Sequence, residues 1–377
     1  MHIDVATELL GGLSPSRFMR RHWQKSPLLV RQAWPGVQAP MSRSGLFDLA
    51  GQDDVESRLL TRVGDGWRLR PGPLPRSALP PLKQSGWTLL VQGLDLHCDA
   101  ALAMRQRFAF AGQARLDDVM VSYASDGGGV GPHLDAYDVF LLQLQGTRRW
   151  RVGRVRDKRL VDGAPVKLLR HFEPEFDWLL GPGDMLYVPP LWGHDGVAVG
   201  PCMTASIGFR APRRSDLARD MLAQLADDID TPDGELPLRD RPAQASATPG
   251  RVPTVLRDAA QAAVARAMNQ TDALERALGQ QLSEPKPQVW FDAGLALADA
   301  RVGLCLDRRS RMLYDDRHLF INGEAFVCGG KDAALLRLLA DTGALTGSAA
   351  AGLSKQAWAQ VSDWAQAGWL HGQKEVA

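Results

Sequence analysis

Residues 127–143 read Gly-Gly-Gly-Val-Gly-Pro-His-Leu-Asp-Ala-Tyr-Asp-Val-Phe-Leu-Leu-Gln, and this stretch is the most informative part of the chain. A glycine-rich turn leads into an apolar run typical of a strand, which bears the pair His133-x-Asp135. Because residues two apart on a strand point to the same side, His133 and Asp135 can share one ligand. An imidazole and a carboxylate are two of the three ligands of the 2-His-1-carboxylate triad, which leaves positions open on iron(II).

Two histidines compete to supply the third ligand. His194 follows residues 188–193, Val-Pro-Pro-Leu-Trp-Gly, where an apolar strand ends at a double proline and the next strand is expected to begin. His171 lies in residues 170–175, Arg-His-Phe-Glu-Pro-Glu, a charged stretch that is typical of a loop. The sequence therefore favours His194 over His171, and the expected ligand set is His133, Asp135 and His194.

An iron site of this type needs a second substrate that supplies electrons. The segment Gly146-Thr147-Arg148-Arg149-Trp150 follows the metal-binding strand through a predicted turn. An arginine at the start of the next strand could hold the distal carboxylate of 2-oxoglutarate through two parallel hydrogen bonds. Six arginines lie between residues 148 and 159, so chemistry alone leaves the choice open, and most of them are expected on a solvated strand face.

The chain around this stretch, from about residue 56 to residue 210, alternates short apolar runs with glycine and proline. This pattern predicts an antiparallel sandwich or barrel rather than a parallel sheet with crossover helices. Residues 94–108 are the exception, because their apolar spacing predicts a helix. Strands are expected at 59–63, 67–70, 87–92, 119–123, 137–145, 148–155, 184–188, 196–199 and 203–209.

Beyond Pro212 the pattern becomes helical. Helices are predicted at 215–228 and 254–282, on either side of a Pro/Gly/Ala/Ser-rich linker at 231–253. Their apolar faces would pack either on another copy of the chain or back on the first domain. After residue 287, a hairpin with the turn Asn322-Gly323 and helices at 331–341 and 354–366 predict a helix-plus-wing unit.

Composition limits the class of protein. A chain of 377 residues that is 45% hydrophobic, with a formal net charge of +1, is expected to form two or three domains. The near-neutral charge argues against a protein that coats nucleic acid, so direct nucleic-acid binding is not expected. Four scattered cysteines without a CxxC motif argue against a cysteine zinc site and fit a reducing cytosol. With no visible signal peptide and no long apolar run, a cytoplasmic protein without membrane association is expected.

The motifs together resemble those of the JmjC (cupin-like) 2-oxoglutarate oxygenases. The resemblance rests on His133-x-Asp135, Gly146-x-Arg148-x-Trp150 and the segment from Val188 to His194. Residues 18–28, Phe-Met-Arg-Arg-His-Trp-Gln-Lys-Ser-Pro-Leu, are similar to the entry segment of the ribosomal-oxygenase branch, and the three-part layout matches that branch. The resemblance implies an α+β protein with a double-stranded β-helix (jelly-roll or cupin) catalytic domain at 1–211. It also implies a helical dimerisation segment with linker at 212–286 and a winged-helix-like domain at 287–377.

Carried over by position, the resemblance implies that His133, Asp135 and His194 bind iron(II) and that Arg148 binds 2-oxoglutarate. A hydroxyl residue that assists 2-oxoglutarate in some members falls on Ala124, with Ser122 and Ser125 as neighbours, and this departs from the family pattern.

The resemblance also places a substrate pocket at Asp118, Met120 and Tyr137. Tyr137 is expected to share strand parity with His133 and Asp135, and Asp118 and Met120 share a face of the preceding strand. A carboxylate there would suit a guanidinium substrate.

The activity implied by the resemblance is hydroxylation of an arginine β-carbon in a large-subunit ribosomal protein by a homodimeric Fe(II)/2-oxoglutarate dioxygenase. Three alternatives remain open. An N-methyl demethylase would use the same iron and cosubstrate. A non-catalytic cupin-like scaffold would bind the ribosome through its C-terminal domain, and a DNA-binding regulator would use the same module but is disfavoured by the net charge.

Overall fold

The computed structural model describes residues 2–64, 66–227, 237–239, 245, 247–269, 272–297 and 302–373. Most of the predicted linker at 231–253 lies outside the described residues. The contacts within the chain divide it into two compact units, Met1–Ala211 and Pro212–Ala377, which are described separately. In the part of the chain that the structure describes, no helix has the length and apolar character needed to cross a membrane.

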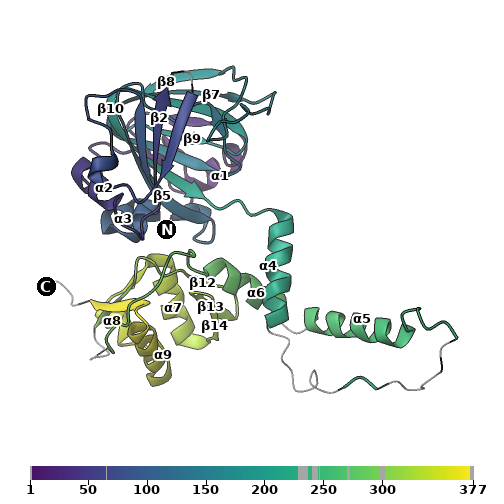
Figure 1. Ribbon diagram of the computed structural model, residues 1–377. Helices are drawn as coiled ribbons and strands as arrows, with labels where there is room; N and C mark the ends of the chain where they lie inside the picture. Colours follow the sequence, from purple (N-terminus) through teal and green to yellow (C-terminus); the bar gives the residue numbers. More distant parts are fainter. Residues whose placement is uncertain are drawn as a thin grey trace. The chain divides into compact units, whose positions relative to one another are not determined.

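The first unit is built on one large antiparallel sheet (Figure 1). Its main path runs β1-β9-β7-β10-β5-β4-β2-β3, while β6 pairs with β10 and β8 pairs with β7. This arrangement confirms the predicted antiparallel β-rich class. The strands are β1 (Leu28–Val30), β2 (Ser57–Val63), β3 (Gly66–Pro71), β4 (Trp87–Val91), β5 (Leu116–Ala124), β6 (His133–Leu134), β7 (Val139–Arg154), β8 (Phe176–Leu180), β9 (Met185–Val188) and β10 (Trp192–Phe209).

Two strands, β7 and β10, are continuous where the sequence predicted a break in each. The predicted turn after residue 145 is wrong, because β7 passes through Gly146 with a left-handed φ of 65°. A Cβ at Gly146 would lie 2.2 Å from the carbonyl oxygen of Pro201 on β10, so only glycine fits this crossing. The register between the two strands shifts near Met203, as in a β-bulge. Strand β7 pairs with β9 through its first half and with β8 through its second half.

Short helices complete the first unit, namely α1 (Pro15–Arg21), α2 (Arg43–Leu49) and α3 (Asp99–Gln106), with single 3₁₀ turns at Glu8–Leu10, Arg76–Ala78, Leu94–Leu96 and Ala109–Ala111. The predicted single helix at 94–108 is therefore wrong in extent. Cys98 is extended and separates the 3₁₀ turn from α3. Asp95 is buried in that turn, where it accepts from Val119 N at 2.8 Å and from Arg105 Nη1 at 2.7 Å, so tertiary contacts override the helical periodicity.

Helix α1 packs on the core of the first unit. Ser14 caps the helix by accepting from Arg17 N at 3.3 Å, and Pro15 occupies the first turn. Phe18 is fully buried and lies 4.9 Å, ring to ring, from Tyr187 on β9. Removing such a ring typically destabilises a protein by about 3 to 5 kcal/mol. The segment singled out in the sequence at 18–28 is thus a structural part of the barrel.

The second unit combines helices with two three-stranded sheets, β15-β11-β16 and β12-β13-β14. Asn322 and Gly323 both have positive φ and join β13 to β14, so the predicted hairpin turn is confirmed. The elements are α4 (Arg214–Asp227), α5 (Thr254–Met268), α6 (Ala273–Ser283), β11 (Gly303–Leu306), β12 (Met312–Tyr314), β13 (His318–Ile321), β14 (Glu324–Val327), α7 (Gly330–Thr342), β15 (Ala344–Leu345), α8 (Gly347–Ala350), α9 (Lys355–Gln366) and β16 (Leu370–Gln373).

Helices α4 and α6 share a small buried cluster, and helices α4 to α6 leave many of their large apolar side chains exposed. Ala273 and Ala277 of α6 pack with Leu225 of α4, and Gly279 sits directly against the ring of Phe320. Helix α5 buries none of its side chains. The large apolar side chains that remain exposed on these helices are Leu222, Val255, Leu256, Val264, Met268 and Leu274.

Candidate active site

A cavity of about 480 Å³ lies within the first unit. The register of three neighbouring strands determines which of their side chains line it side by side. Ser206 on β10 lies opposite Met120 on β5 and Leu141 on β7. Two residues earlier on β10, Thr204 lies opposite Ser122 on β5. The cavity therefore combines apolar and hydroxyl side chains from three neighbouring strands.

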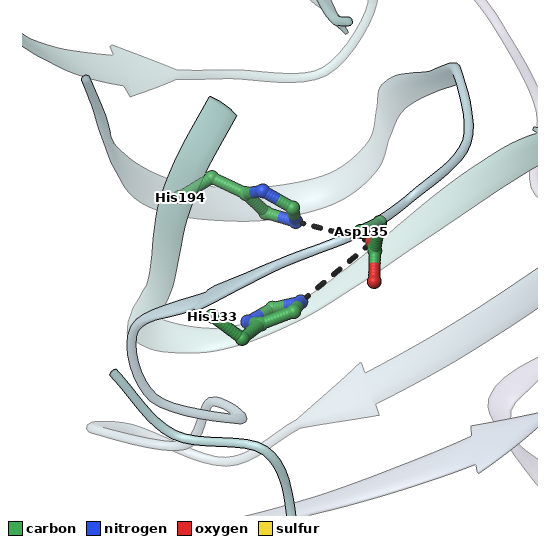
Figure 2. A group of neighbouring side chains, drawn as sticks. All are labelled: His133, Asp135 and His194. Carbon is green, nitrogen blue, oxygen red and sulfur yellow. Dashed lines mark ion pairs between the residues drawn. The ribbon is translucent and has the colours of Figure 1, made fainter. Parts of the chain in front are cut away.

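The three predicted metal ligands meet at one wall of this cavity (Figure 2). His133 on β6 is the direct cross-strand neighbour of His194 on β10, and their ring centroids are 4.2 Å apart. The Asp135 Oδ2 atom lies 3.6 Å from His194 Nε2 and 3.9 Å from His133 Nε2. One ligand atom from each residue lies within 4.8 Å of the others, so a single ion can reach all three.

The sequence argument for the position of Asp135 was wrong in its geometry. Strand β6 ends at Leu134, so Asp135 reaches the histidines from a loop and not by strand alternation. The loop is held at Asp135 O, which accepts from Leu191 N at 2.8 Å. It is held again at Asp138, whose carboxylate accepts from Tyr187 Oη at 2.5 Å and from Gln24 Nε2 at 3.2 Å.

Both imidazoles are prepared for metal binding through Nε2. His133 Nδ1 is 2.8 Å from Gly131 O, and His194 Nδ1 is 3.2 Å from Trp192 O. A carbonyl oxygen only accepts, so each Nδ1 carries a proton, and the neutral form of each ring then has its lone pair on Nε2. Burial, with the nearby His133, lowers the pKa of His194 to about 4. The His194 ring is therefore neutral at pH 7, as a metal ligand must be.

This lowered pKa predicts that the metal-free protein loses stability in mild acid. Between about pH 6.5 and pH 4 the unfolded His194 takes up a proton that the folded one does not, so the free energy of unfolding falls with falling pH. Urea unfolding should show a loss of about 1 to 2 kcal/mol between pH 7 and pH 5 from this residue. The His194→Gln variant should lose that share of the pH dependence. An identical pH dependence in both proteins would contradict the assignment.

Arg148 is a buried cation that has no anionic partner among the residues that the structure describes. It is 3% exposed, and no described aspartate or glutamate forms an ion pair with it. Its Nη1 donates to Ser122 Oγ at 3.2 Å and to Thr204 Oγ1 at 3.4 Å, and Nη2 donates to Gly196 O at 3.1 Å. Burial lowers the pKa of Arg148, but a guanidinium remains charged in proteins. A desolvated cation that lines a cavity favours an anionic ligand there.

The environment of Arg148 also differs from that of the neighbouring arginines. Gly196 leaves the space that this side chain needs, since a Cβ there would lie 2.8 Å from Arg148 Nε and 2.6 Å from the Trp150 ring. The other arginines with carboxylate partners lie on the exposed face of the strand or loop. Their pairs are Arg149 with Asp177, Arg151 with Asp195, Arg154 with Glu175 and Arg159 with Asp157.

The remaining residues named from the sequence are spread around the site. Asp118 and Met120 line the cavity from β5, and Asp118 Oδ2 accepts from Gly93 N at 3.1 Å. Tyr137 also lines the cavity, but it lies in the loop before β7, so the predicted strand parity is wrong. Enclosure and the nearby carboxylates of Asp135 and Asp118 raise the pKa of Tyr137.

Two of the sequence candidates lie away from the cavity. Ala124 lies further along β5 than Ser122 and packs with Ala198 and Cys202 instead of lining the cavity. His171 is exposed and belongs to no strand. Thr204 was not among the residues named from the sequence. The signal that could have found it is a polar residue within an otherwise apolar predicted strand.

Comparisons with known proteins agree with this architecture. Residues 103–217 match the JmjC domain family, and residues 266–371 match the ROXA-like winged helix family. The ribosomal protein uL16 3-hydroxylase of Escherichia coli K12 is 38% identical over 201 residues, which cover 53% of each chain. A probable ribosomal oxygenase of Haemophilus influenzae is 38% identical over 210 residues, covering 54% of this chain and 52% of the relative. These alignments thus span about half the length of the curated relatives.

The solved structures extend the likeness to nearly the whole chain. The X-ray structure of E. coli YcfD superposes with a TM-score of 0.82 at 27% identity, covering 95% of this chain and 98% of that one. A second YcfD structure, described as a ribosomal oxygenase in complex with cobalt and 2-oxoglutarate, superposes with a TM-score of 0.79. The JmjC domain, the winged helix and this full-length structural likeness show that the chain belongs to the bacterial branch of the JmjC-domain ribosomal oxygenases.

Proposed function

We propose that the chain is an iron(II)- and 2-oxoglutarate-dependent hydroxylase that adds oxygen to an arginine β-carbon of the large-subunit ribosomal protein uL16. The observation that carries the reaction type is one cavity that holds both a His133–Asp135–His194 cluster and the unpaired guanidinium of Arg148. The substrate is inferred from the likeness to the E. coli uL16 3-hydroxylase.

The donor set fits a ferrous ion. Two imidazole nitrogens and one carboxylate oxygen match the facial triad that leaves coordination positions open for other ligands. When bound there, iron(II) supplies the activation of dioxygen that accompanies oxidative decarboxylation of 2-oxoglutarate to succinate and carbon dioxide. His133, Asp135 and His194 hold the ion, and Arg148 would bind the distal carboxylate of the cosubstrate.

The remaining lining residues would orient the substrate and limit its contact with water. Met120 and Leu141 supply apolar surface next to Ser206 in the cavity. Asp118 offers a carboxylate for a cationic side chain, and Tyr137 adds an aromatic surface to the lining. Such a lining would aim a C–H bond of an arginine side chain at the metal wall.

The test is mass spectrometry of large-subunit ribosomal proteins incubated with this protein, iron(II), ascorbate and 2-oxoglutarate. We expect one added oxygen atom on uL16, located by fragmentation to an arginine, and no change when 2-oxoglutarate is left out. Loss of a methyl group would establish the demethylase instead. No change in any ribosomal protein, with no conversion of 2-oxoglutarate to succinate, would favour the non-catalytic scaffold.

We also propose that the chain forms a homodimer through helices α4 to α6. Six large apolar side chains are exposed on these helices and α5 buries none of its own, and a second copy of the chain would cover them. Light scattering coupled to gel filtration should give a dimer for the native chain. The double variant Val264→Asp/Met268→Asp, with both changes one turn apart on α5, should be a folded monomer. The exposed Gln261→Glu control should remain dimeric, and a monomeric native chain would refute the proposal.

A further inference from the structure

A row of three buried polar side chains crosses the sheet beside Arg148. Gln143 on β7, Thr204 on β10 and Ser122 on β5 lie opposite one another in register. Their exposed fractions are 0%, 1% and 3%. Thr204 and Ser122 line the cavity and contact Arg148, whereas Gln143 does not line it. Because buried polar groups are costly unless they are bonded, the directions of the hydrogen bonds in this row are closely constrained.

The backbone determines the orientation of the Gln143 amide. Its Nε2 is 2.9 Å from Gln145 O and 3.4 Å from Gly146 O. Both are carbonyl oxygens that only accept, so the amide nitrogen faces them and Oε1 faces the other way. Oε1 then accepts from the Thr204 hydroxyl at 2.9 Å. The only proton of the Thr204 hydroxyl is therefore used on Gln143.

Because the Thr204 proton is used on Gln143, the hydroxyl groups of Thr204 and Ser122 differ in whether they can donate a hydrogen bond beside Arg148. Thr204 Oγ1 presents lone pairs alone and accepts from Arg148 Nη1 at 3.4 Å. Ser122 Oγ also accepts from Nη1, at 3.2 Å, but its own proton has a long contact of 3.4 Å with Thr204 O. Ser122 can therefore turn its proton toward an incoming carboxylate at little cost, whereas Thr204 cannot.

We propose that Gln143 is a positioning residue for the cosubstrate, which acts through Thr204 to orient Arg148 beside Ser122, the hydroxyl neighbour already named from the family resemblance. The inference rests on the proposed function, since it assumes that a 2-oxocarboxylate with a second carboxylate enters this cavity. Gln143 itself touches neither the cavity nor the carboxylate. Its effect would reach the cosubstrate only through the hydrogen bonds of Thr204 and Arg148.

The experiment measures the dissociation constant of 2-oxoglutarate by calorimetry on cobalt(II)-loaded protein. We expect Gln143→Met and Thr204→Val each to weaken binding by roughly tenfold, as expected when a hydrogen bond to a charged group is disturbed. The double variant should be no weaker than the single ones, because both changes break the same connection. Ser122→Ala should weaken binding by roughly ten- to a hundredfold, since it removes the donor itself.

Two controls separate positioning from a general structural role. Gln145→Met changes an exposed side chain on the same strand and should leave the dissociation constant as it is in the native chain. In turnover assays, Gln143→Met should raise the KM for 2-oxoglutarate far more than it lowers kcat, with the KM for the protein substrate unchanged. Native affinity in Gln143→Met, or additive losses in the double variant, would overturn the inference. Failure of the native protein to bind 2-oxoglutarate would instead refute the proposed function.

Discussion

Replacing Asp135 by alanine is expected to reduce turnover by roughly 10³-fold or more. Loss of a mere supporting partner of a metal ligand typically costs 10- to 100-fold, and Asp135 is the one carboxylate in the cluster that we propose as the metal-binding triad. Its Oδ2 faces the Nε2 atoms of both His133 and His194, so its removal leaves two neutral donors and no negative charge to offset the cation. Equilibrium dialysis with cobalt(II) should show a parallel loss of metal affinity.

The matched control is Asp162→Ala, which removes an exposed carboxylate paired with Arg170 on the surface. This variant should bind metal and turn over like the native chain, because exposed ion pairs contribute about 1 kcal/mol or less. Circular dichroism should show both variants folded. Substantial turnover by folded Asp135→Ala protein with metal still bound would contradict the assignment of this residue as a ligand.

Replacing Arg148 by methionine is expected to weaken 2-oxoglutarate binding by roughly 10²- to 10³-fold. Truncating one partner of a buried, hydrogen-bonded charge pair typically costs about 2 to 5 kcal/mol, and here the second partner would be the cosubstrate carboxylate. The stability of the cosubstrate-free protein should change in the opposite direction. Removing a buried cation that has no anionic partner among the described residues should leave the free energy of unfolding unchanged or raise it.

This opposition between affinity and stability distinguishes a binding residue from a structural one. Calorimetry gives the affinity, and urea unfolding without cosubstrate gives the stability. Arg149→Met is the matched control, because the neighbouring Arg149 pairs with Asp177 on the exposed face. It should change neither quantity by more than about 0.5 kcal/mol. If Arg148→Met instead unfolds the protein and leaves the affinity of the remaining folded fraction intact, Arg148 is a structural residue.

Much of the fold follows from local patterns. The short apolar runs and turn residues predicted an antiparallel β-rich domain, and the turn Asn322-Gly323 predicted the hairpin of the second unit. Two of the errors have a common origin. The predicted turn at Gly146 and the single helix at 94–108 both fail where a tertiary contact replaces a local preference. At Gly146 that contact is the backbone of Pro201, which lies on a different strand.

The donor set proposed for the metal follows from the sequence alone, because the residue types of His133, Asp135 and His194 define it whatever their exact geometry. Which arginine faces the cavity could not be predicted locally, since burial of Arg148 and surface pairing of its neighbours depend on the whole sheet. The tertiary structure also brought Ser122, Thr204 and Gln143 into one row. Thr204 is 82 residues from Ser122 and 61 from Gln143, and no local pattern sets a strand register over such separations. That register follows from burying one face of every strand at once.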